Sequence, residues 1–272
     1  MNVIILLGIT SFTIITLALI RHLYSEIHAK KHTIEGIQGV QYFVELIKLT
    51  QQHRGMHSGL LNGNLDFKDK LTQVEKDIQT QYDAILSFEK KHAYPAQLSI
   101  QYAHKQWLKL LQNNAIQSSQ SFQLHTGLIN RQLDALWDLA DEFALTTSRQ
   151  KTVRQTAQQL VKTLPELAEA LGQIRALSVQ VASKQDLSSD KKLQLIFTLE
   201  KITEHHAKLS QLLPANSNQV LQQFIGEIKR SVEQDTLSQR DPDGLFQDAS
   251  QIINQLFDVV NNRLTELKQA FR

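Results

Sequence analysis

The chain has 272 residues, enough to bury one elongated hydrophobic core or two small ones. Its 29 lysine and arginine residues nearly balance 27 aspartate and glutamate residues, so the net charge is only +2, and no basic block or basic-aromatic stripe indicates a nucleic-acid partner. The absence of cysteine excludes disulfides, thiol nucleophiles and cysteine metal sites. With only 10 glycines and 4 prolines, the composition favours helices.

The first predicted element is an apolar helix at the N-terminus. Residues 3–20 carry no charged side chain, and this length reaches the lower end of the roughly 20 residues that a membrane-spanning helix needs. No basic segment precedes the run and no small-residue cleavage site follows it, so we expect an uncleaved anchor instead of a signal peptide. Positive side chains follow at Arg21, Lys30 and Lys31. The positive-inside rule then predicts a single-pass protein of the inner membrane with a cytoplasmic body; a periplasmic body is the alternative.

Helices are expected throughout the rest of the chain. Apolar residues recur at spacings of three and four, as in residues 37–47, whereas no stretch alternates convincingly with period two. Short breaks separate the helical segments, and two of them carry capping signals, at Ser188-Ser189 and at Asp241-Pro242. Helices joined by short breaks pack as antiparallel neighbours.

The helical segments fall into two groups, about 34–146 and about 164–271, with a polar, helix-permissive stretch between them. One long helix across that stretch would run from one bundle into the other. We therefore predict an all-α fold of two stacked antiparallel helical bundles that share long helices, preceded by an N-terminal transmembrane helix. The predicted boundaries are residues 1–33 for the anchor and juxtamembrane helix and residues 34–272 for the helical body.

Polar residues occupy part of a predicted buried seam. The apolar stripe of residues 37–47 continues through Gln51, Arg54 and Ser58. A buried guanidinium is strongly destabilising unless a carboxylate or another anion satisfies it. Two interpretations follow. Arg54 is part of an internal salt bridge or reaches water along its aliphatic stem, or it contributes to an anion site between helices, since its planar fork suits a planar oxyanion.

Two further arginines lie beside predicted apolar seams. Arg175 follows Ile174 at the edge of the seam in residues 164–174, and Arg263 falls on the apolar stripe of the last helix. Three long helices that each place one arginine against an apolar seam form a pattern compatible with an anion site.

These stretches resemble a known family. The segment "YFVELIKLTQQHRGMHSGLLNGN", residues 42–64, is similar to the first-helix signature of the nitrate- and nitrite-sensing (NIT) domain, in which an apolar helix runs into a Gln-x-x-Arg-Gly-x-x-Ser-like element. The segments 121–141, 164–182 and 245–267 also resemble later NIT segments in the same order. The likeness covers about residues 34–268.

The resemblance implies an all-helical double bundle that binds nitrate or nitrite between helices through arginines and passes a conformational change to an output. The candidate ligand-binding residues are Arg54, Arg175, Arg263, Ser58 and Gln51. Members often carry an acidic residue before the Arg-Gly pair, where this chain has His53. Family members are commonly fused to output modules, and none stands before Arg272, so we expect the signal to be read by a partner protein or by a second copy of the chain in a homodimer.

Other functions have weaker support in the sequence. No Ser-His-Asp spacing, glycine-rich phosphate loop or paired-carboxylate signature stands out, so we expect neither an enzyme nor a cofactor. Two alternatives to the sensor are a helical scaffold that acts through protein contacts and a metal-binding bundle built on His53 and His57. A cavity lined by two or more arginines would favour the sensor, a fully packed seam the scaffold, and a third ligand near the histidines the metal site.

Overall fold

The computed structural model describes residues 2–113, 115–148, 150–209 and 212–271, and within these ranges it contains helices and no strand. This confirms the predicted all-α class. The α-helices are α1 (Asn2–Leu61), α2 (Phe67–Lys91), α3 (Gln101–Leu111), α4 (Ser118–Glu142), α5 (Lys151–Gln158), α6 (Leu164–Lys184), α7 (Ser189–Leu209), α8 (Ala215–Glu233) and α9 (Pro242–Ala270). The short turns are the 3₁₀ turns η1 (Ala96–Leu98) and η3 (Leu237–Gln239) and the π-helical turn η2 (Gln159–Thr163).

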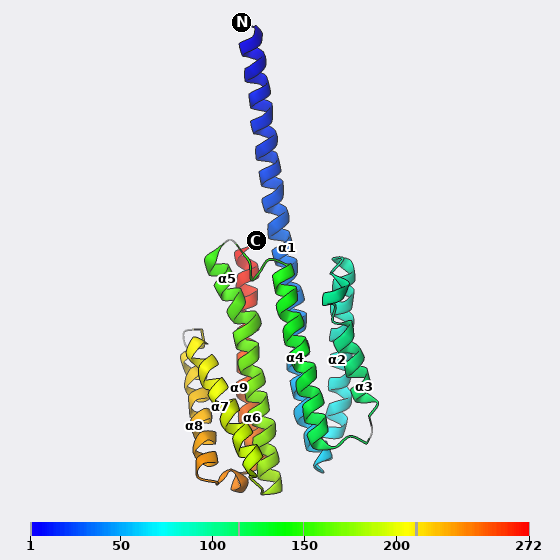
Figure 1. The fold of residues 1–272 in the computed structure, drawn as a ribbon, viewed down its shortest axis with the longest axis vertical. Coiled ribbons are helices and arrows are strands. Elements are labelled where there is room, and N and C mark those ends of the chain that lie inside the picture. Colours follow the sequence, from blue (N-terminus) through cyan, green and yellow to red (C-terminus); the bar gives the residue numbers. More distant parts are fainter. Residues whose placement is uncertain (1, 114, 149, 210–211, 272) are drawn as a thin grey trace.

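The helices form two bundles that lie side by side along their length (Figure 1). In the first bundle, α1 packs against α2 and α4, and α3 packs against α4; in the second, α6 packs against α7 and α9, and α8 lies against α7 and α9. The bundles meet where α1 and α4 face the second bundle, with α1 in contact with both α6 and α9. The bundles are therefore joined along their sides, and α1 is a long helix that both of them share.

The polar stretch between the halves does not carry one helix from bundle to bundle. The first bundle ends where α4 stops at Glu142, and Ala144 then takes a left-handed conformation with φ 56°. A continuous run of α5, η2 and α6 follows, all on the side of the second bundle. Pro165 lies just after the π turn. A proline lacks an amide hydrogen and crowds the carbonyl four residues earlier, and the chain widens into the π turn over those same residues.

The predicted apolar seams form the core. The side chains of Ile37 and Ile47 on α1, and of Leu164 and Ile174 on α6, are fully buried. The last helix begins as expected from its capping signal, because the Asp241 carboxylate accepts hydrogen bonds from the next backbone amides, the shorter of them at 2.8 Å. Periodicity and capping together account for this part of the fold.

The first half of α1 projects beyond the bundles (Figure 1). Large apolar side chains between Phe12 and Ile27 are exposed there. Among the residues that the structure describes, no helix is both long enough and apolar enough to cross a membrane, so the predicted transmembrane anchor is not supported. Part of that prediction falls on residues 3–7, 9 and 10, whose side chains lie outside the described part. The membrane side of the body stays a prediction.

A glycine substitution tests the close contact between α1 and the end of α4. A Cβ atom on Gly36 would lie 2.3 Å from Cβ of Phe143, a position held by the backbone, so Gly36→Ala should lower the free energy of unfolding by about 1–3 kcal/mol. Gly226→Ala is the control, because a Cβ there meets nothing within 4 Å and alanine in a helix should stabilise by about 0.5–1 kcal/mol. Urea denaturation of both variants measures the effect. Equal effects of the two substitutions would contradict the packing described.

Candidate functional site

Arg54 forms a fully buried ion pair between the two bundles. Its Nη1 donates to Oε1 of Glu169 at 2.6 Å and its Nη2 donates to Oε2 at 3.1 Å. The exposed fractions of the two side chains are 0% and 2%. Nη1 also donates to the Thr126 hydroxyl at 3.0 Å, and the guanidinium lies over the Phe122 ring. The polar position that the sequence predicts in the core is real, and an internal carboxylate occupies the guanidinium fork.

Glu169 accepts hydrogen bonds from amide side chains as well as from Arg54. Nε2 of Gln51 donates to Oε2 at 3.0 Å, and Nε2 of Gln173 donates to Oε1 at 2.9 Å. Each carboxylate oxygen therefore accepts two hydrogen bonds, one of which comes from the guanidinium. Charge-assisted hydrogen bonds of this kind hold the carboxylate in one orientation.

Arg175 is a second buried guanidinium, with an exposed fraction of 4% and only neutral partners among the described residues. Its Nη1 donates to the Ser250 hydroxyl at 2.9 Å and its Nη2 to the backbone carbonyl of Gln51 at 2.8 Å. Its Nε has no partner within the described part of the chain, and the guanidinium lies over the Phe246 ring. Burial, and then the positive charge of Arg54, lower the pKa of Arg175 to about 9, against the opposing effect of Glu169.

The two arginines fit because each lies against a glycine of the opposite helix. A Cβ on Gly172 of α6 would lie 2.6 Å from Nη2 of Arg54, and a Cβ on Gly55 of α1 would lie 3.0 Å from Nη2 of Arg175. This reciprocal arrangement, called here the arginine–glycine crossing, explains physically why Arg54 and Gly55 are adjacent in the sequence. It brings α1 and α6 together while keeping both guanidiniums between them.

A cavity of about 580 Å³ opens beside Arg175, between α1, α2, α6 and α9. Its wall includes Gln51 and Ser250, which accept hydrogen bonds from Arg175. The wall also contains three cationic side chains and one anionic side chain. The charged lining residues are Arg175, Lys48, Lys70 and Asp258. Lys48 is paired with Glu45 at 3.6 Å and is part of the outer wall. The cavity therefore has a buried positive group at its inner end and an electrostatic balance that favours anions.

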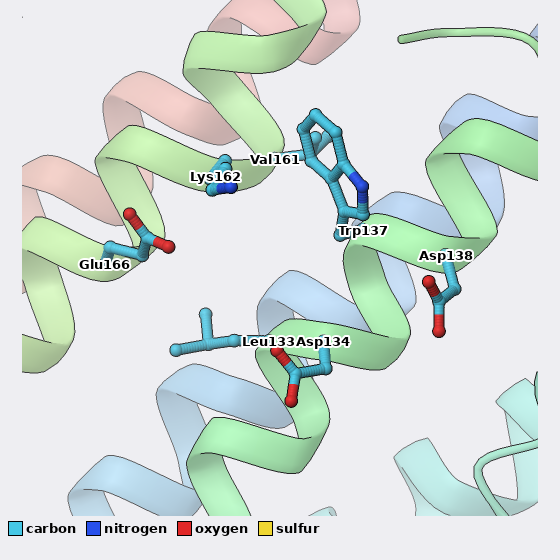
Figure 2. A pocket seen from close by; sticks show the side chains of 7 residues that line it. All are labelled: Leu133, Asp134, Trp137, Asp138, Val161, Lys162 and Glu166. Atoms are coloured by element: carbon cyan, nitrogen blue, oxygen red, sulfur yellow. The ribbon is translucent and has the colours of Figure 1, made fainter.

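A smaller cavity of about 280 Å³ lies between α4 and the start of α6 and has the opposite character (Figure 2). Three carboxylates line it, those of Asp134, Asp138 and Glu166, together with Lys162. Nζ of Lys162 lies 5.0 Å from the centroid of the Trp137 ring. Burial, Asp134 and Asp141 raise the pKa of Asp138. An anion would be repelled here, so this cavity does not compete with the one at Arg175.

The remaining candidate residues divide between the site and its surroundings. Gln51 joins the site through its amide and its carbonyl. Ser58 is half-buried one turn beyond Arg54 and lies 3.3 Å from the Ser118 hydroxyl, facing α4. Arg263 lies on the exposed side of α9 and pairs with Glu266 at 2.8 Å. The buried stripe of α9 passes through Leu264 instead, so the predicted position of Arg263 on that stripe is wrong.

A cluster of histidines adjoins Arg54 on the side of the first bundle. Nδ1 of His125 lies 2.7 Å from the carbonyl oxygen of Ser121, which can only accept, so Nδ1 donates and Nε2 is the free acceptor of a neutral ring. Nδ1 of His53 then donates to that Nε2 at 2.8 Å. Nε2 of His53 faces Oε1 of Glu75 at 3.3 Å. His125 is 72 positions from His53, and no signal in the sequence links the two.

The histidine cluster does not form a metal site in this arrangement. Among the described residues, no group of three or more histidine, cysteine, aspartate or glutamate side chains could hold a metal ion. The hydrogen bond between His53 and His125 occupies the Nε2 lone pair of His125, the histidine that would be the third ligand beside His53 and His57. Burial, and then His53, lower the pKa of His57 to about 4 and that of His125 well below its usual value. The cluster is therefore a packed polar part of the core beside the ion pair.

Removing Arg54 should destabilise the protein, because Glu169 would stay buried without its cation. We expect Arg54→Ala to lower the free energy of unfolding by about 3–5 kcal/mol, measured by chemical denaturation. Arg263→Ala is the matched control, since this arginine has an exposed ion pair and should change stability by only about 0–1 kcal/mol. If Arg54→Ala had no larger effect than the control, the ion pair would not be a structural requirement.

The histidine cluster should make the protein sensitive to mild acid. Because burial lowers the pKa of His57 and His125 in the folded state, the unfolded state takes up more protons as the pH falls below about 6.5. The free energy of unfolding should therefore decrease from pH 6.5 to pH 4. His57→Gln should make that decrease shallower. The carboxylates are the same in both proteins, so subtracting one pH curve from the other removes their contribution and leaves that of His57. Parallel curves for the two proteins would exclude His57 as a source of the acid sensitivity.

Comparison with known proteins identifies the family of this fold. The family described as "Nitrate and nitrite sensing", NIT, matches residues 45–268. A solved structure titled "Structure of the NasR transcription antiterminator" has a similar fold, with a TM-score of 0.70 and 13% sequence identity over 95% of this chain and 74% of that chain. No curated protein sequence gives a match. The match covers most of the chain, including Arg54, Arg175 and Glu169, and the protein therefore belongs to the NIT family of nitrate- and nitrite-sensing domains.

Proposed function

We propose that this domain senses nitrate or nitrite by binding the anion in the cavity beside Arg175, with the Arg54–Glu169 ion pair as a fixed part of the site. The observation that carries this proposal is the difference in charge between the partners of the two guanidiniums. The Nε of each guanidinium lacks a partner among the described residues, but Arg54 already has a carboxylate in its fork, whereas Arg175 is almost as deeply buried and donates only to a hydroxyl and a backbone carbonyl. The arginine whose charge is not paired with a carboxylate is the one to which an anion is attracted.

Electrostatics supports an anion at this position. Burial of the Arg175 charge has a cost, which its lowered pKa of about 9 reflects. An anion against the guanidinium would restore the stability of the charged form, and Lys48 and Lys70 at the outer wall would help to attract it. Nitrate and nitrite are planar oxyanions, which match the planar fork of Arg175. A small anion would fill only part of the cavity, and water would occupy the rest.

The connections of Arg175 suggest how binding would be transmitted. The side chain comes from α6 and donates to α1 through the Gln51 carbonyl and to α9 through Ser250. An anion on the guanidinium would change the balance of these contacts and with it the relative populations of helix arrangements. The size of that shift cannot exceed the difference in ligand affinity between the two arrangements. We propose that a partner protein, or a second copy of the chain in a homodimer, reads the change.

Replacing Arg175 tests the site directly. Arg175→Gln should weaken nitrate binding by about ten- to over a hundredfold, the equivalent of a lost charge-assisted contact of about 1.5–3 kcal/mol. Arg175→Lys should also weaken binding, because a point charge does not reproduce the planar fork. Calorimetric titration with nitrate and nitrite measures both effects, with Arg263→Gln as the control for loss of an arginine outside the site.

The dependence of binding on pH gives a second readout of the same prediction. Because the site needs the charged form of Arg175, nitrate affinity should fall as the pH rises through about 9. Unchanged affinity in Arg175→Gln would exclude this arginine from the site. A parent protein that binds neither anion would favour the alternative that the domain acts as a helical scaffold through protein contacts.

A further inference from the structure

We propose that Glu169 makes the site selective for monovalent anions, an inference that rests on the proposed anion site at Arg175. The residue contacts Arg54 and the Gln51 amide and does not itself line the cavity, so we expect its effect on a ligand to be exerted mainly through its charge. The NIT family is named for two monovalent anions, nitrate and nitrite. Glu169 supplies a physical means of favouring them over divalent oxyanions such as sulfate.

The charges buried at the arginine–glycine crossing add up to one positive charge. Arg54 and Arg175 each contribute one positive charge and Glu169 contributes one negative charge, with exposed fractions of 0%, 4% and 2%. Interactions among such groups are strong because water screens them poorly. The other charged groups that face the cavity are on its outer wall, where Lys70 and Asp258 are exposed and Lys48 is paired with Glu45. Solvent and salt weaken their effect.

One buried positive charge is balanced by one monovalent anion. Nitrate or nitrite at Arg175 would leave the buried region neutral. Sulfate would bring a second negative charge into the same region with no buried cation to balance it, at a large desolvation cost. Selectivity between these anions therefore does not need a difference in shape.

The hydrogen bonds of Glu169 keep this charge in place. Four donors hold its two oxygens, two of them from Arg54 and one each from Gln51 and Gln173, at distances of 2.6–3.1 Å. A ligand that displaced Glu169 from Arg54 would have to replace all of these contacts and leave a buried carboxylate without its cation. The geometry thus favours a carboxylate that stays bound to Arg54 while the ligand occupies Arg175.

The test compares nitrate and sulfate binding in the full chain at constant ionic strength, by calorimetric titration. The parent should bind nitrate at least about tenfold more tightly than sulfate. Glu169→Gln keeps the shape but raises the buried charge from one to two, so the nitrate-to-sulfate affinity ratio should fall by about tenfold or more. Glu166→Gln is the matched control, because it removes the same charge from the same helix one turn earlier. The Glu166 side chain is 30% exposed and lines the acidic cavity, so this substitution should leave the nitrate-to-sulfate affinity ratio unchanged.

A double variant decides the question if Glu169→Gln does not fold. Arg54→Gln with Glu169→Gln removes both members of the ion pair, leaves the buried charge of Arg175 as it is in the parent and restores a net charge of one at the crossing, so it should fold and show the nitrate preference of the parent. Loss of nitrate binding in this double variant would show that the ligand uses Arg54 itself and would overturn the inference. An unchanged affinity ratio in Glu169→Gln would also overturn it. A parent that binds no nitrate would instead refute the proposed function, so the two failures are distinguishable.

Discussion

Two buried guanidiniums, each lying against a glycine of the other's helix, set the distance between α1 and α6. A Cβ at Gly172 would lie 2.6 Å from Nη2 of Arg54 and one at Gly55 would lie 3.0 Å from Nη2 of Arg175, so a larger residue at either position would require the guanidinium or its helix to shift. The close approach brings Glu169 within reach of Arg54 and the Gln51 carbonyl within reach of Arg175. The side-by-side arrangement of the bundles, the ion pair and the cavity beside Arg175 all depend on this contact.

The crossing also explains how the core tolerates two like charges. Desolvation disfavours both guanidiniums, and their mutual repulsion adds to that cost. One of them is stabilised by a carboxylate that is itself fully hydrogen-bonded, and the other by a hydroxyl, a carbonyl and an aromatic face. The result is a folded domain with one incompletely compensated charge next to a cavity. In the proposed function, a bound anion would compensate the charge that the fold accommodates at a cost.

Sequence reasoning predicted the helices and the buried Arg54 because both follow from periodicity along a single element. It did not find the partner of Arg54, since α6 is buried on nearly all sides and its spacing does not single out the face that carries Glu169. The error at Arg263 has a simple geometric cause: after Val260 the buried stripe continues four residues on at Leu264, not three residues on. The side-by-side packing and the contact of His53 with His125 depend on pairing between distant segments, which the periodicity of a single sequence does not reveal.

The continuity of α1 has a mechanical consequence. The helix runs from Asn2 to Leu61 without interruption, so the turn that carries Arg54 and the part that projects beyond the bundles belong to one rod. At a rise of about 1.5 Å per residue, the far end lies roughly 80 Å from Arg54. A tilt of only about 2° at the crossing would swing that end by nearly 3 Å, if the rod stays straight. A small tilt of α1 at the crossing would in this way become a larger displacement at the other end of the helix.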